Sequence, residues 1–142
     1  MPVAAWIPTR GSLSLTETTM MNFLKSLLFG SGHDLGPDDA ATAIQSGAPV
    51  IDVREPQEFA TGAIAGAINV PLGQIQRQGL AALHGAGVDI DAPTLLLVCR
   101  SGARSGSACL ALRGALGERA KNVAGGVMAW ESRGLPLTPG GR

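Results

Sequence analysis

The residues with the clearest chemical potential lie together in one short segment that begins at a cysteine, Cys99. Only the thiolate form of cysteine is a nucleophile, and nearby positive charge or a helix N-terminus lowers a thiol pKa from its ordinary value of about 8.5. The segment offers both, so we expect Cys99 to be an activated nucleophile. The residues expected to bind an anion beside it follow directly: Arg100, Ser101, Gly102, Ala103, Arg104 and Ser105.

The flanking sequence predicts a strand before this segment and a helix after it. Residues 95–98 are continuously apolar, which is typical of a strand buried on both faces. Cys109, Leu112 and Leu116 recur at helical spacing and predict a helix over 105–117. The first amides of such a helix have no partner within the helix and point into the preceding loop, where they bind anions.

The second cysteine and the two histidines could also take part in chemistry, but their positions in the sequence do not indicate a catalytic role. Cys109 lies on the apolar helical stripe, so we expect it to fill core space; a resolving thiol for oxidised Cys99 is the alternative. His33 and His84 are the only histidines, and neither has neighbours with metal-ligand spacing. We therefore expect no metal and no cofactor, and we assign activation of Cys99 to amides and arginines.

Asp52 and Arg54 come at the end of a second apolar segment, 50–53. Parallel strands end at the same edge of a sheet, so we expect both residues close to the cysteine loop. Arg54 and Glu58 are four residues apart, a spacing that predicts an ion pair across a helical turn. A supporting role that holds the loops in place is the main interpretation, and direct contact with substrate is the alternative.

Helices alternate with short apolar strands along the chain, which predicts an α/β fold: a parallel sheet of about five strands with helices on both faces. A helix is expected to open at Pro37 and end at Gly47, and Trp130 is expected to anchor core packing. The other expected strands are 50–53, 68–70, 95–98 and 121–124, and the other expected helices are 56–61, 73–83, 105–117 and 127–133.

Length and composition exclude several classes of protein. The 142 residues predict one domain over 33–138 and an N-terminal extension, 1–32, with a short helix near 21–29. Eleven basic and eleven acidic residues balance, and no basic face for nucleic acid emerges. The apolar stretch of the extension is too short for stable membrane insertion. Two cysteines argue against a disulfide framework, so we expect a reducing, cytoplasmic setting.

The cysteine segment resembles the active loop of the rhodanese (sulfurtransferase) family, which has the form Cys, four residues, Arg, then Ser or Thr. Here the match is Cys99 to Arg104, followed by Ser105. Three further stretches resemble the family in the family's order: VIDVREPQEF at 50–59, GAIAGAINVPL at 62–72, and NVAGGVMAW at 122–130 with GLP at 134–136. The resemblance covers roughly residues 33–138.

The resemblance implies a rhodanese-like fold and transfer of sulfane sulfur through a persulfide on Cys99. Related phosphatases and arsenate reductases carry one more residue between Cys and Arg, so the four residues found here favour a single bound sulfur atom. The implied partners are a small anionic donor such as thiosulfate and a thiol acceptor, a sulfur-accepting protein, or cyanide in an assay. The alternatives are a non-catalytic binding module and a phosphatase or arsenate reductase on the same fold.

Overall fold

The computed structural model describes residues 33–140, which form a five-stranded sheet and its covering helices. The extension 1–32 and its expected helix near 21–29 lie outside the described residues. The strands are β1 (Asp34–Leu35), β2 (Val50–Asp52), β3 (Ile68–Asn69), β4 (Leu95–Val98) and β5 (Ala120–Val123). The helices are α3 (Pro37–Gln45), α4 (Pro56–Ala60), α5 (Leu72–Gln78), α6 (Leu80–Gly85), α7 (Ala103–Leu116) and α8 (Gly126–Ser132), with a 3₁₀ turn at Gly117–Arg119.

All five strands are parallel and lie in the order β1, β5, β4, β2, β3. The apolar strand β4 is therefore central, and its Leu97 pairs with Ile51 on one side and with Asn122 on the other. The short strands β1 and β3 form the edges. The predicted α/β class with a parallel sheet of about five strands is confirmed.

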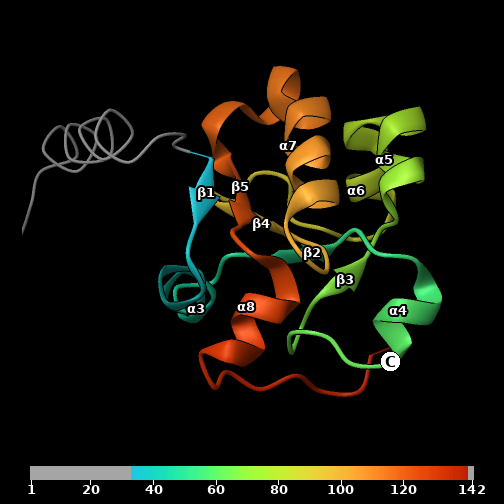
Figure 1. Ribbon diagram of the computed structural model, residues 1–142. Helices are drawn as coiled ribbons and strands as arrows, with labels where there is room; N and C mark the ends of the chain where they lie inside the picture. Colours follow the sequence, from blue (N-terminus) through green and yellow to red (C-terminus); the bar gives the residue numbers. More distant parts are fainter. Residues whose placement is uncertain (1–32, 141–142) are drawn as a thin grey trace, which may run out of the picture. The chain divides into compact units, whose positions relative to one another are not determined.

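Helices cover both faces of the sheet, as the sequence predicts (Figure 1). Leu95 and Leu97 pack with α5, α6 and α7 on one face, while Leu96 and Val98 pack with α3 and α8 on the other. Successive residues of a strand point to opposite faces of the sheet. Because helices cover both faces, all four side chains of β4 are buried. The site loop that follows β4 is thus attached to the best-buried strand of the domain.

Most of the expected elements shift by one or two residues at an end, and three differences stand out. The helix expected over 73–83 is two helices, α5 and α6, separated at Gly79, whose φ of +59° is a conformation that favours glycine. Helix α7 begins two residues earlier than expected, at Ala103. Strand β1 was not expected, because two residues of which one is an aspartate show no strand periodicity. Trp130 is buried in the core, as predicted.

Leu97→Ala should lower the free energy of unfolding by about 3 kcal/mol, because it leaves a cavity under a fully buried strand. Leu110→Ala is the matched control: Leu110 is 62% exposed, and its truncation should change stability by no more than about 0.5 kcal/mol. Urea denaturation of both variants measures the difference. Equal effects would contradict the assignment of β4 to the centre of the core.

Candidate active site

The candidate nucleophile, Cys99, is the first residue after β4 and lies at the carboxyl edge of the sheet. The chain turns sharply there and enters α7 through Gly102, whose φ of +105° is in the left-handed region. This turn aims the Gly102 N–H at the sulfur, with 3.0 Å between the nitrogen and Sγ. Ligands of parallel α/β sheets bind at this edge, outside the carboxyl ends of the strands.

The loop backbone is held from the side by the turn between β5 and α8. Val127 N–H donates to the Cys99 carbonyl at 2.9 Å, and Met128 N–H donates to the Arg100 carbonyl at 3.1 Å. Gly126 makes this approach possible, because a Cβ there would lie 2.3 Å from the Arg100 carbonyl oxygen. The Gly125–Gly126 pair therefore fixes the shape of the cysteine loop as well as the sharp entry into α8.

The environment of Cys99 favours its thiolate. Burial opposes ionisation and by itself raises the pKa of the thiol. Hydrogen bonds from the Ser105 hydroxyl and from the backbone N–H groups of Ser105, Gly102 and Ser101 more than offset that effect, so the pKa lies below the ordinary value of a thiol. The groups that lower the pKa of Cys99 are therefore backbone N–H groups and one hydroxyl group.

Ser105 is fully buried on the first turn of α7, with its Oγ 3.3 Å from Sγ of Cys99. The same hydroxyl lies 2.5 Å from Oδ1 of Asn122 on β5. Asn122 is a site residue that the sequence analysis missed. Asparagine is depleted in strands, so an asparagine inside the strand expected over 121–124 is the signal that could have identified it.

Arg104 does not hydrogen-bond to the sulfur in this structure, because Glu58 on α4 binds its guanidinium group through two hydrogen bonds. Nη1 donates to Oε1 at 2.7 Å and Nη2 donates to Oε2 at 2.9 Å. The pair lowers the pKa of Glu58 to about 2 and raises that of Arg104. The predicted ion pair between Arg54 and Glu58 is wrong: Glu58 also caps α4 by accepting from the Glu55 N–H, and its carboxylate faces α7.

Asp52 and Arg54 instead bind each other, at the carboxyl end of β2. Arg54 donates to both carboxylate oxygens of Asp52, with 2.8 Å for the shortest contact, and both side chains are buried. The same guanidinium group donates to the Gly62 carbonyl at 2.7 Å, and Asn69 donates to the carbonyls of residues 52 and 54. These contacts tie the carboxyl end of β2 to Gly62 and to β3, and the supporting role of the pair stays a prediction.

The other expected loop residues form the exposed rim of the site. Arg100, Ser101 and Ala103 are exposed. Within residues 33–140, no group of three histidine, cysteine or acidic side chains is placed to hold a metal ion. The described helices are also too short or too polar to cross a membrane.

Cys109 is buried in the core beside α7's other apolar residues, as its stripe predicts. Burial raises the pKa of its thiol to about 12. A thiol in this state is a poor nucleophile near neutral pH, which disfavours the alternative role as a resolving thiol. The two cysteines of the chain are therefore chemically distinct, with opposite displacements of their pKa values.

Comparison with protein families gives one match, and it covers most of the described residues. The family model for the rhodanese-like domain matches residues 36–133, from α3 to the end of α8. The chain belongs to the rhodanese-like domain family. The match includes Cys99, the loop up to Ser105 and the newly identified Asn122, so all of these lie inside the rhodanese domain.

The relatives of this rhodanese domain include proteins that carry the name sulfurtransferase and one that is uncharacterized. A sulfurtransferase of Allochromatium vinosum is 35% identical over 88 residues, which are 62% of this chain and 76% of that protein. An uncharacterized Synechocystis protein is 37% identical over 87 residues, which are 61% of this chain but 45% of that longer relative. The crystal structure of a rhodanese-related protein from Thermoplasma volcanium is 29% identical, with a TM-score of 0.63 over 75% of this chain and 97% of that one.

Glu58→Gln should lower the free energy of unfolding by about 1 kcal/mol at neutral pH, because the side chains of the ion pair with Arg104 are 34% and 35% exposed and are screened by solvent. The folded-state pKa of Glu58, about 2, lies below the value of 4.5 for a free side chain. The stabilisation is therefore present above about pH 5 and is lost as the pH falls towards 2. Parent and variant should converge over this range in urea denaturation.

Glu131→Gln, at an exposed position on α8, is the control for a general change of net charge. It should leave the dependence of stability on pH close to that of the parent. A Glu58→Gln variant that loses stability with acid as steeply as the parent does would show that the ion pair with Arg104 is not the source of the effect.

Proposed function

We propose that this protein is a sulfurtransferase that moves sulfane sulfur from a small anionic donor to a thiol acceptor through a persulfide on Cys99. The observation that carries the proposal is the set of backbone N–H groups that converge on Sγ in a loop with four residues between Cys99 and Arg104. The sulfurtransferase names of the relatives support the same reaction class. Thiosulfate is the donor we propose.

In the first half-reaction the Cys99 thiolate attacks the outer sulfur of thiosulfate. A bond forms between Sγ and that sulfur, the sulfur–sulfur bond of thiosulfate breaks, and sulfite leaves with the electron pair. The total charge of minus three is conserved, because a thiolate and a thiosulfate dianion become a persulfide anion and a sulfite dianion. No oxidant or cofactor is needed for this step.

The loop is suited to hold the anionic product. The outer sulfur of the persulfide carries the charge, and preorganised N–H groups stabilise such a charge without having to reorient. The exposed Arg100 at the rim supplies a guanidinium charge that attracts an anionic donor, whereas Arg104 is already paired with Glu58. Arg100 is therefore the residue that we expect to matter most for capture of the donor.

In the second half-reaction an acceptor thiolate, or cyanide in an assay, attacks the outer sulfur and regenerates the Cys99 thiolate. A low-molecular-weight thiol or a protein thiol satisfies this chemistry. The reaction requires Cys99 to be reduced, so we propose that the protein works in the reducing cytoplasm. Both cysteines are free thiols in the structure, which is compatible with that setting.

Incubation with thiosulfate should add one sulfur atom, about 32 Da, to the intact protein, because one persulfide forms per chain. Cys99→Ser should abolish the gain. Cys109→Ala is the matched control, since it removes the buried thiol that has a pKa of about 12, and should retain both the mass gain and turnover to within a few-fold. Mass spectrometry of the intact protein measures the gain directly.

Two results would contradict the proposal. If no sulfane donor, whether thiosulfate, mercaptopyruvate or a small persulfide, adds sulfur to Cys99, the protein is not a sulfurtransferase and a binding role takes its place. If the protein instead hydrolyses an aryl phosphate, and alkylation of Cys99 stops that hydrolysis, the loop serves phosphatase chemistry.

A further inference from the structure

The Ser105 hydroxyl group lies between two acceptors and has a single proton to donate. Its Oγ is 2.5 Å from Oδ1 of Asn122 and 3.3 Å from Sγ of Cys99. A hydroxyl group donates one hydrogen bond at a time, although it accepts others with its lone pairs. The Asn122 amide and the Cys99 thiolate therefore compete for the same proton.

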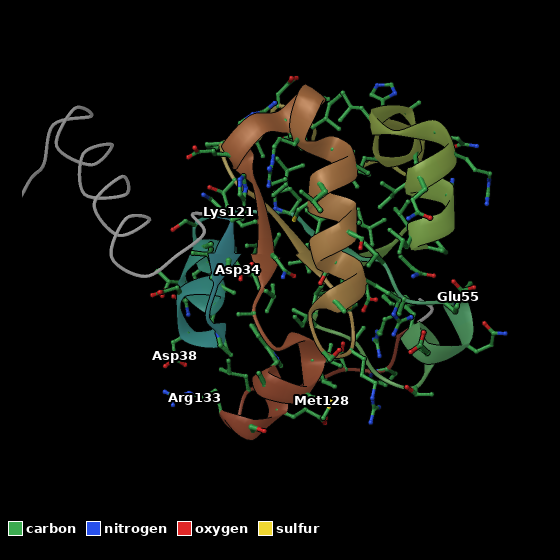
Figure 2. The ribbon with its side chains drawn as sticks, turned by 45° about the horizontal axis from the view of Figure 1, so that its top comes forward. Asp34, Asp38, Glu55, Lys121, Met128 and Arg133 are labelled. Carbon is green, nitrogen blue, oxygen red and sulfur yellow. The ribbon has the colours of Figure 1, made fainter. Side chains whose placement is uncertain are left out.

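The orientation of the Asn122 amide is fixed by its other contacts. Nδ2 donates to the Gly102 carbonyl at 3.1 Å and to Oδ1 of Asp34 at 3.2 Å. A reversed amide would place its oxygen against a carbonyl and a carboxylate oxygen, which are both acceptors. Asp34 and the Gly102 carbonyl thus keep Oδ1 of Asn122 turned towards Ser105, and Figure 2 shows Asp34 on β1 close to β5.

The free thiolate and the persulfide differ in where their charge sits. In the thiolate the charge is on Sγ itself, next to the Ser105 hydroxyl. In the persulfide Sγ is a bridging atom, and the charge resides chiefly on the outer sulfur. A hydrogen bond to Sγ therefore stabilises the free thiolate more than the loaded form, and any group that withholds this bond favours loading.

We propose that Asn122 is a positioning residue that draws the Ser105 hydroxyl proton away from the Cys99 thiolate. In this way Asn122 favours the sulfur-loaded form of the site, an inference that rests on the proposed function. Asp34 contributes to this effect indirectly, because it accepts a hydrogen bond from the Asn122 amide and so orients it. Both residues of this interaction are buried, Asn122 on β5 and Ser105 on α7.

Charged and titratable residues also occur on the elements that carry or adjoin this chain of hydrogen bonds. They are Arg100 in the loop, Arg104 and Cys109 on α7, Glu58 on α4, Asp52 and Arg54 at the end of β2, His33 and Asp34 at β1, and Lys121 on β5. Substitution of Ser105 leaves these groups in place. A double-mutant cycle between Asn122 and Ser105 therefore separates the hydroxyl proton from the general electrostatics of the site.

The first measurement does not depend on sulfur transfer. The rate of alkylation of Cys99 by iodoacetamide is followed against pH by mass spectrometry of the Cys99 peptide, in the parent and in Asn122→Leu, Ser105→Ala and the double variant. Asn122→Leu should lower the midpoint of thiolate formation by about one pH unit, because the hydroxyl is released to the sulfur. In the Ser105→Ala background the same substitution should leave the midpoint unchanged.

If Asn122 has a purely structural role, Asn122→Leu should shift the midpoint of thiolate formation in the opposite direction. Loss of its bond to the Gly102 carbonyl would loosen the loop, weaken the amide hydrogen bonds and raise the midpoint. A rise, no change, or a fall that persists without the Ser105 hydroxyl overturns the proposal. If Asn122→Leu does not fold, Asp34→Ala at the exposed edge strand replaces it, with a smaller fall expected and the same dependence on Ser105.

The second measurement reads the balance between free and loaded forms. In mixtures of thiosulfate and sulfite above the midpoint of thiolate formation, Asn122→Leu should need about a tenfold higher thiosulfate to sulfite ratio for half-loading of Cys99. An unchanged or lower ratio overturns the proposal. If the alkylation results hold but the parent takes up no sulfur, the competition for the Ser105 proton stands and the proposed function is what fails.

Discussion

Burial of an ionisable thiol at Cys99 is the constraint on which the rest of the site depends. The residue is 1% exposed, and a thiolate out of water is costly unless dipoles replace its hydration. In this structure the replacement is the Gly102 N–H, neighbouring amides and the Ser105 hydroxyl, instead of a contacting cation. Such donors stabilise the sulfur only while the loop keeps its shape, so the surrounding elements serve chiefly to hold that shape.

The loop is held by the strand that precedes it and by parts of the chain that are distant in sequence. Strand β4 anchors its start in the centre of the sheet, the amides that open α8 bind its carbonyls, and Asn122 binds the Gly102 carbonyl. Glu58 binds Arg104 and keeps that guanidinium group beside the loop. The rhodanese-like domain thus combines a loop whose N–H groups point at Sγ of Cys99 with a rim at which Arg100 is exposed.

Local patterns in the sequence predict the framework well, because they depend on neighbouring residues. The apolar run 95–98 is strand β4 within the same bounds, and the helical stripe through Cys109 lies in the core. Long-range pairs were not predictable in this way. Glu58 is four residues from Arg54 but binds Arg104, 46 residues away, and Asn122 meets Ser105 only because β5 lies beside β4. The roles of Arg100, Arg104 and Ser105 in sulfur transfer stay predictions.

The central claim is that the hydrogen-bond donors of the loop lower the pKa of the buried Cys99 thiol. A titration of thiolate ultraviolet absorbance, taken as the difference between the parent and Cys99→Ser, tests it most directly, since Cys109 has a pKa of about 12 and contributes little below that pH. The account predicts that Cys99 titrates below the ordinary thiol value of about 8.5. A midpoint at or above that value would mean that burial outweighs the loop dipoles and would contradict the account.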